Sequence, residues 1–401
     1  MSTKHQLTLK ILSRYLKASR KEKTRILDEF CANTGYNRKY AITKLGIYQM
    51  EERERPRRRR RERKYGLEVQ KALEKIWKTC DRICSARLHP FIPEMVSVLK
   101  RFKEIHLRAE TEAKLYMISR ATIDRLLRNA RKREGIRLRG TTKPGTLLKH
   151  EIPIRTGAWK ETSPGFGEID LVVHCGNSMA GHFAHTLNYT DIATTWSERE
   201  SVLGRAQPGV HQALRNISDR LPFSLCGIDS DNDSSFINDQ ILRYCRKRKI
   251  VFTRSRPYKK NDNAHVEQKN WTTVRKIFGY VRIDTQRQVD MMNQLYSGSL
   301  RDYTNYFQPA QKLLEKKRVG SRVVKKYDTA KTPYQRVLES KEVLEEVKEK
   351  LRTHYMNLNP VALRKEVEKG LEKLFSSVEK RYRTYGEDAE MRGLAHVEIT
   401  A

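Results

Sequence analysis

Three acidic residues occupy sequence contexts that suit metal-dependent chemistry. Asp170 lies within an apolar strand pattern, Asp231 directly follows a second strand pattern, and Glu267 lies in a helical pattern. Strand alternation turns Asp170 off the plane of its sheet, and ligands gather at the carboxyl ends of strands in open sheets. Mg²⁺ prefers oxygen ligands of this kind. Two such ions, about 3.5 to 4 Å apart, can activate a water or a 3′-hydroxyl and stabilise the departing oxygen of a scissile phosphate.

Neighbours of these carboxylates offer further candidates. Asp229 also lies at the end of the second strand pattern and is the alternative ligand to Asp231, which we choose by motif and spacing. Four polar residues near Glu267 are candidate phosphate contacts: Lys260, Asn263, His265 and Lys269. We expect Trp271 and Phe278, on the helix of Glu267, to pack against the sheet. We interpret His174, Cys175, His182 and His185 as structural, because their spacing yields no tetrahedral metal site.

The elements around the carboxylates follow a recognisable order. Strands are expected to begin at residues 167, 181 and 195 and to form a meander. A helix near 210–221, a strand at 224–229, a helix at 235–249, a strand at 250–254 and a helix from 263 follow. This order predicts a ribonuclease-H-like mixed sheet between helices.

The motifs also resemble a known family. The segment Ser230-Asp-Asn-Asp-Ser-Ser-Phe-Ile-Asn resembles the second-aspartate motif of retroviral-integrase-type transposases, and Asn261-Asp-Asn-Ala-His-Val-Glu-Gln-Lys-Asn-Trp resembles their glutamate motif. Residues 232 to 266, an interval of 35 residues, separate Asp231 from Glu267, which is similar to the family's spacing. Asp170 matches its first aspartate. Asp233 and Ser235 stand where the family commonly has a glycine and an acidic residue.

This resemblance to bacterial DDE-type insertion-sequence transposases implies a catalytic and metal-binding triad of Asp170, Asp231 and Glu267. It also implies two Mg²⁺ ions per active site, for which Mn²⁺ can substitute, and a reaction of DNA cleavage followed by strand transfer. The implied partners are double-stranded DNA, as element ends and target, and a second copy of the chain, because two ends must be joined.

The N-terminal residues show a helix-turn-helix pattern. Apolar residues recur at helical spacing through residues 1–50, and Asn33 to Gly35 supply a turn before a basic helix. We expect Tyr40, Ala41 and Leu45 to face inward. The residues expected to face a DNA groove are Asn37, Arg38, Lys39, Thr43 and Lys44.

A second basic region follows the first helices. An unbroken arginine run occupies the linker and is expected to lie along DNA: Arg57, Arg58, Arg59, Arg60 and Arg61. A second helix-turn-helix is then expected, with Ser119 as an N-cap, Ile123, Leu126 and Leu127 inward, and Arg120, Thr122, Arg125 and Arg128 outward.

The expected domain boundaries follow from these patterns. We expect a helix-turn-helix domain at 1–50, an arginine-rich linker at 51–65, a second helical DNA-binding domain at 66–140, a linker at 141–160, the catalytic core at 161–285, and a basic, mainly helical region at 286–401. Within the last, residues 325–338 suggest an irregular basic stretch. Residues 340–383 suggest helices broken at Asn359-Pro360, as a solvent-facing hairpin or a partner helix.

Composition narrows the function classes. The 82 Lys and Arg residues outnumber 48 Asp and Glu residues, which gives a formal net charge of +34. Such an excess favours a polyphosphate partner. No apolar run is long enough for a membrane span, and the first residues show no secretory pattern, so we expect a cytoplasmic, nucleoid-associated protein of bacterial type with reduced cysteines. Two other functions fit: a nuclease of the same fold, and an inert DNA-binding regulator derived from a transposase.

Overall fold

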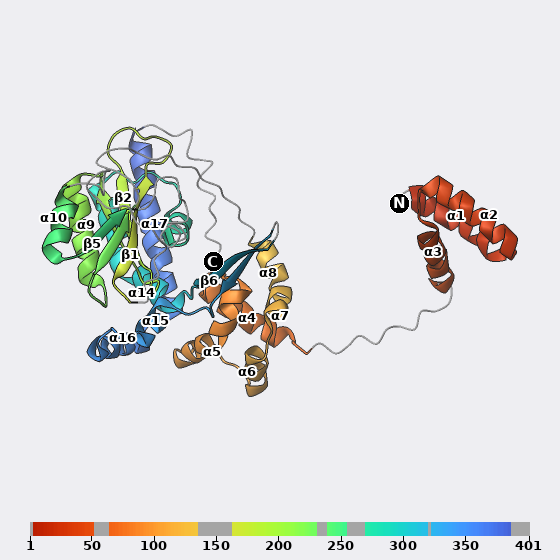
Figure 1. The fold of residues 1–401 in the computed structure, drawn as a ribbon, viewed down its shortest axis with the longest axis horizontal. Helices are drawn as coiled ribbons and strands as arrows, with labels where there is room; N and C mark the ends of the chain where they lie inside the picture. Colours follow the sequence, from red (N-terminus) through yellow and green to blue (C-terminus); the bar gives the residue numbers. More distant parts are fainter. Residues whose placement is uncertain are drawn as a thin grey trace. The chain divides into compact units, whose positions relative to one another are not determined.

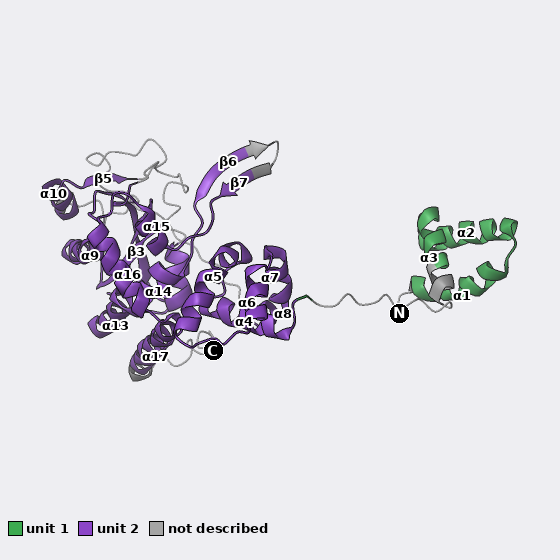
Figure 2. Ribbon diagram, turned by 90° about the horizontal axis from the view of Figure 1, so that it is seen from below, with its two compact units in different colours: residues 1–64 green, residues 65–401 purple. Residues whose placement is uncertain are grey.

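The computed structural model describes residues 3–51, 64–134, 163–230, 239–254, 269–319 and 322–385. The chain divides into two compact units, residues 1–64 and residues 65–401 (Figure 2). Figure 1 shows the helices and strands of both units. None of the helices in the described ranges has the length and apolar character that crossing a bilayer requires.

The described part of the first unit contains three helices: α1 (Thr3–Lys17), α2 (Arg20–Thr34) and α3 (Arg38–Glu51). Gly35 ends α2 in the left-handed conformation, with φ 69°, and its N–H donates to Cys31 O at 2.8 Å. Phe30, Ala41 and Leu45 are fully buried in the core of the unit. The inward position expected for Tyr40 is wrong, because Ala41 and Leu45 occupy the core-facing stripe and leave Tyr40 52% exposed.

A five-stranded sheet lies at the centre of the second unit, in the order β3-β2-β1-β4-β5. Its strands are β1 (Phe166–His174), β2 (Ala184–Asp191), β3 (Ser197–Leu203), β4 (Gly227–Ser230) and β5 (Val251–Arg254). β1, β2 and β3 form an antiparallel meander, whereas β4 and β5 run parallel to β1. This arrangement is ribonuclease-H-like, as predicted. β2 and β3 start later than expected, because Gly181 (φ 72°) and Thr195 (φ 61°) adopt turn conformations.

Helices cover both faces of this sheet. α9 (Gln207–Arg220) and α10 (Asp239–Arg248) pack on the face that carries Ile169, Leu187 and Ile228. The opposite face, which carries Val172 and Ala184, meets the π-helix η1 (Asn270–Arg275), α12 (Lys276–Phe278) and α13 (Gln286–Ser297). Strand alternation places Asp170 on this second face.

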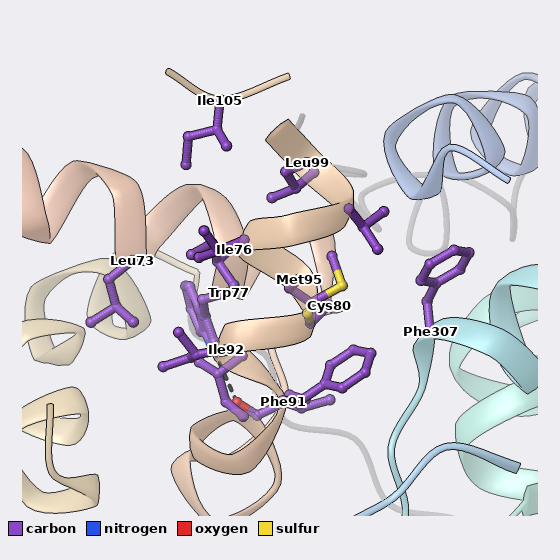
Figure 3. Packing of buried hydrophobic residues seen from close by; sticks show 14 of the residues in the cluster. Leu73, Ile76, Trp77, Cys80, Phe91, Ile92, Met95, Leu99, Ile105 and Phe307 are labelled. Atoms are coloured by element: carbon purple, nitrogen blue, oxygen red, sulfur yellow. Dashed lines mark hydrogen bonds between the residues drawn. The ribbon is translucent and has the colours of Figure 1, made fainter. Parts of the chain in front are cut away.

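The helical block that precedes the sheet shares a core with the C-terminal region. It comprises α4 (Leu67–Thr79), α5 (Ser85–Arg101), α6 (Ala109–Tyr116), α7 (Arg120–Leu126) and α8 (Arg128–Arg133). Trp77 and Met95 belong to a cluster that also contains Phe307 of α14 (Ser299–Phe307) and Trp196 of the β2–β3 turn. Figure 3 shows Phe307 facing the residues of α4 and α5. This shared core joins the block, which we expected as a separate domain, to the sheet in one unit.

The short helices α6 and α7 follow each other closely in the segment where we expected a second helix-turn-helix, which stays a prediction. Ser119 caps α7 by accepting a hydrogen bond from Thr122 N. Ile123 and Leu127 are fully buried, while Arg120 and Arg125 are exposed. The outward position expected for Thr122 is wrong: it is buried, and its hydroxyl interacts with the Ser119 cap at 3.1 Å.

The C-terminal helices are α15 (Pro333–Glu339), α16 (Glu345–Asn357) and α17 (Pro360–Tyr385), with the expected break at Asn359-Pro360. The expectation of a solvent-facing hairpin is wrong for α17. Its Leu371, Leu374 and Val378 are buried with Met292 of α13 in the cluster beneath the sheet. The apolar stripe of α17 therefore completes the hydrophobic cluster on this face of the sheet.

The expected irregular basic stretch is also partly wrong. β6 (Leu313–Val319) and β7 (Arg322–Tyr327) pair as an antiparallel hairpin, with Leu313 opposite Tyr327 and Lys317 opposite Val324. Lysines with low strand propensity hid this hairpin in the sequence.

Candidate active site

Asp170 lies in the middle of β1, on the sheet face covered by η1. Its Oδ1 accepts a hydrogen bond from Leu171 N at 2.8 Å, and its Oδ2 accepts one from Asn270 Nδ2. The side chain is partly buried. The carboxylate is thus held between its own strand and the first residue of η1, which fixes its direction.

A polar row crosses the sheet at the level of Asp170. Antiparallel pairing sets Asp170 opposite Asn188 of β2, and Asn188 opposite Arg199 of β3. Asn188 Nδ2 donates to Asn270 Oδ1 at 2.7 Å, so that Asn270 bridges Asn188 and Asp170. Buried amides without partners are costly, and this bridge therefore positions Asn270 firmly against the carboxylate.

Arg199 completes the row and is fully buried. Burial lowers its pKa to about 10, against the opposing influence of Tyr296 and Glu198. Its guanidinium lies 5.8 Å from the centre of the Tyr296 ring. The sheet face beside Asp170 therefore contains an enclosed positive charge, which favours negative charge nearby.

The parallel pairing of β1 with β4 ends at Ile169 opposite Ser230, one residue before Asp170. Asp231 is the next residue in the chain and lies outside the described residues. Asp229, the alternative ligand, is fully buried, and its Oδ1 accepts a hydrogen bond from Thr253 Oγ1 at 2.5 Å. Asp229 pairs with Glu168 across the two strands, two residues before Asp170.

The described part of the glutamate motif begins at Lys269. Glu267, together with the candidate phosphate contacts Lys260, Asn263 and His265, lies outside the described residues. Burial lowers the pKa of Lys269 to about 7, and the charges of Arg199, Arg87 and Arg336 lower it further. A nearby anion would favour the charged form of Lys269.

The two aromatic residues of this helical segment differ. Phe278 is fully buried among Val172, Val274 and Tyr296, as expected. The packing expected for Trp271 is wrong, because it is 41% exposed. Thr273 and Val274 are the residues of η1 that face the sheet and take the buried positions, which leaves Trp271 on the solvent side.

Three residues at the site were missed in the sequence. Asn270 follows Glu267 by one helical turn, and this spacing could have identified it. Asn188 is a polar residue inside a buried strand, which is also a recognisable signal. Arg275 is the third: burial lowers the pKa of its guanidinium, and the negative charge of Asp170 opposes that shift. No pattern in the sequence linked Arg275 to β1.

The histidines of the sheet have local partners. His174 is buried, and its Nε2 interacts with Thr186 Oγ1 at 2.8 Å. His185 Nδ1 interacts with Phe183 O at 3.1 Å. Within the described ranges, His, Cys, Asp and Glu form no group of three that could hold a metal, and those ranges include only Asp170 of the expected triad.

In the first unit, the expected DNA contacts lie on or beside α3. Asn37 caps the helix, with Oδ1 accepting from Lys39 N at 2.9 Å, and Arg38 pairs with Asp28 of α2. Thr43 is exposed, and Lys44 Nζ donates to Tyr36 OH at 3.0 Å. Arg57 to Arg61 lie outside the described residues. The exposed face of α3 remains a predicted groove contact.

Comparisons with known proteins found solved structures with a similar fold and a relative of similar sequence. No family model matches the chain. Solved structures with a similar fold include the catalytic core of BIV integrase (15% identity, TM-score 0.27, 48% of this chain and 98% of that chain). The HTLV-2 integrase catalytic core in complex with magnesium gives 12% identity and a TM-score of 0.28, over 37% of this chain and 90% of that one.

A simian T-cell lymphotropic virus intasome gives 14% identity and a TM-score of 0.32, over 59% of this chain and 72% of that chain. Because these TM-scores are low, the fold is assigned from the strand order and connections of this chain. The "Uncharacterized protein y4rM" of Sinorhizobium fredii (strain NBRC 101917 / NGR234) is 42% identical over 330 residues, covering 82% of this chain and 93% of the relative. The chain therefore belongs to the family of y4rM.

Proposed function

We propose that the protein is a DNA transposase that cleaves element ends and joins them to target DNA, with Asp170, Asp231 and Glu267 as its catalytic carboxylates. One observation carries the proposal: the carboxylate of Asp170 meets Asn270, and Asn270 is three residues beyond Glu267. The β1–β4 pairing supports Asp231 as the other carboxylate, because the pairing ends one residue before both Asp170 and Asp231. In sequence, Glu267 is three residues from Asn270, and Asp231 directly follows Ser230, which pairs with Ile169.

The donor set suits a hard divalent cation. Asp170 presents carboxylate oxygens on a partly buried strand, and the hydrogen bond from Asn270 orients them. Hydrogen bonds from residues that do not bind the metal themselves typically orient metal ligands. Asp170, Asp231 and Glu267 would hold Mg²⁺ or Mn²⁺, which when bound lowers the pKa of a water and stabilises the departing oxygen. The enclosure of Asp229 supports Asp231 as the second ligand.

The chemistry proceeds in two displacements. A water oxygen attacks the phosphorus at the element end, the phosphorus–O3′ bond breaks, and the departing oxygen takes a proton to become a 3′-hydroxyl. That hydroxyl then attacks a target phosphorus, the new ester bond forms, and the target's own 3′-oxygen leaves. Neither displacement requires a covalent intermediate with the protein.

DNA recognition is assigned to the helix-turn-helix elements. α3 in the first unit and α7 in the second each expose basic residues, among them Lys39, Arg120 and Arg125. Arg57 to Arg61 would follow the phosphates between them. Joining two element ends requires at least a dimer.

The test is metal-dependent cleavage and joining of labelled DNA that carries the ends of the protein's own element. Asp170→Asn, Asp231→Asn and Glu267→Gln are expected to abolish both products while binding to DNA persists. Asp219→Asn is the matched control, because Asp219 is exposed on α9, which covers the opposite sheet face. It should retain full activity.

Other outcomes distinguish the competing functions. Cleavage without joining would identify a nuclease of the same fold. Binding to the ends without any metal-dependent product from the unaltered protein would leave a DNA-binding regulator derived from a transposase, and the enzymatic proposal would fail.

A further inference from the structure

The β6–β7 hairpin is a basic ribbon that extends away from the rest of the second unit (Figure 2). Between Leu313 and Tyr327 the sequence contains six Lys and Arg residues and one acidic residue, Glu315. The four described hydrophobic clusters contain none of the hairpin's residues. Leu314 and Val324 are 62% and 55% exposed. The ribbon therefore contributes little to the packed core.

The base of the hairpin is firmly attached. Asp328 Oδ1 accepts a hydrogen bond from Lys312 N at 2.6 Å, and Asp328 Oδ2 accepts one from Arg336 Nη2 at 2.8 Å. Lys312 Nζ donates to Ala193 O, in the turn between β2 and β3, at 3.0 Å. These contacts tie the base to α15 and to the catalytic sheet, so that the ribbon has a defined origin beside the sheet.

The hairpin has little stability of its own. A lone two-stranded hairpin is marginally stable in water, and like charges directly opposite each other destabilise a strand pair. Here Lys316 is paired with Lys325, and Glu315 with Lys326. Lys317 also pairs with Glu315 at 2.6 Å. One acidic residue balances few of these cations, so the excess positive charge favours an external anion.

We propose that this hairpin is a DNA-binding arm that lies in a groove of double-stranded DNA with its lysines on the phosphates. A two-stranded ribbon fits the major groove of B-form DNA. Lysine residues occur on both strands, so the ribbon can reach phosphates on both sides of a groove. Pairing between the hairpins of two copies is disfavoured, because both carry the same excess charge.

The proposal rests on the proposed function only in naming DNA as the partner. The DNA contacts expected from the sequence lie in the helix-turn-helix elements, the arginine run and the residues near Glu267, and none of them lies in residues 313–327. The arm adds a contact surface that is attached to the catalytic sheet itself. DNA held there is bound by an element whose base contacts the turn between β2 and β3.

The experiment measures binding of the full chain to a labelled DNA duplex over a range of salt concentrations, in EDTA. Lys325→Ala/Lys326→Ala is compared with Lys341→Ala/Lys350→Ala, which removes two exposed lysines near and on α16. Each phosphate contact contributes about 0.9 to the slope of log affinity against log salt. The hairpin variant is expected to lose about 1.8 from that slope, and the control to match the unaltered protein.

Equal slopes for both variants would overturn the proposal. So would a loss seen equally on single-stranded DNA, or a change of oligomeric state by light scattering without a change in slope. Circular dichroism checks that the hairpin variant keeps its fold, which the exposure of both lysines favours. Because EDTA removes divalent ions, a protein without cleavage activity can still confirm the arm, and an active one can still refute it.

Discussion

Replacing Asn270 by alanine tests whether the bridge between η1 and the sheet positions the carboxylate of Asp170, the proposed metal ligand. The substitution removes the hydrogen bond from Asn270 Nδ2 to Asp170 Oδ2 and leaves Asn188 Nδ2 without its acceptor. A hydrogen bond to a charged group contributes about 1.5–3 kcal/mol. At about 1.4 kcal/mol per tenfold change, strand transfer should slow by roughly 10- to 150-fold. Loss of an outer contact to a metal ligand typically costs about 10- to 100-fold.

The assay is the rate of joining of pre-cleaved element ends as a function of Mg²⁺ concentration. Asn270→Ala should need more Mg²⁺ to reach half of its maximal rate, since a misdirected Asp170 binds the ion less well. Asn357→Ala is the control, because this exposed amide bonds only the Thr353 carbonyl of its own helix. An Asn270→Ala protein with unchanged rate and unchanged Mg²⁺ dependence would refute the positioning role.

Three further predictions concern the fold around the site. Glu198→Ala removes the buried acceptor of two arginines and a tryptophan; urea unfolding should show a loss of about 3–5 kcal/mol, and a change below 1 kcal/mol would contradict the network. Gly167→Ala would put a Cβ against the ring of buried Tyr189, and we expect about 1–3 kcal/mol of destabilisation by overpacking, visible as a lower midpoint in the same assay. Burial lowers the pKa of His174 to about 3. The unfolded chain therefore binds a proton below about pH 6.5 that the folded chain does not. As the pH is lowered from about 6.5, the free energy of unfolding should decrease by up to about 1.4 kcal/mol per pH unit from this group. A His174→Gln protein should lose that component of the slope, and an identical slope would contradict it.

Much of the fold could be predicted because its signals are local. The strand patterns, the helix that separates β3 from β4 and the cap at Ser119 each depend on residues that are close in sequence. Their order along the chain is sufficient to indicate a ribonuclease-H-like sheet. Asp170 and the motifs around Asp231 and Glu267 were found in the same way, by residue type and spacing, and the catalytic roles of all three carboxylates remain predictions.

Other features depend on contacts between distant residues. Tyr40 and Trp271 were expected to be buried and are exposed, and Thr122 was expected to be exposed and is buried. In the helices of Tyr40 and Trp271 other residues fill the buried positions, whereas Thr122 is buried beside the Ser119 cap. Spacing alone does not reveal which face a neighbouring element will meet.

The sequence by itself determined the excess of positive charge, the order of the strands and the carboxylates available for metal binding, since these follow from composition and local pattern. Only the tertiary structure decided that α4 and α5 share a core with Phe307, that α17 closes the cluster under the sheet, and that Asn270 bridges Asn188 and Asp170. Residues 100 positions apart meet through the burial of apolar surface, which depends on how whole elements pack and leaves no fixed spacing in the chain.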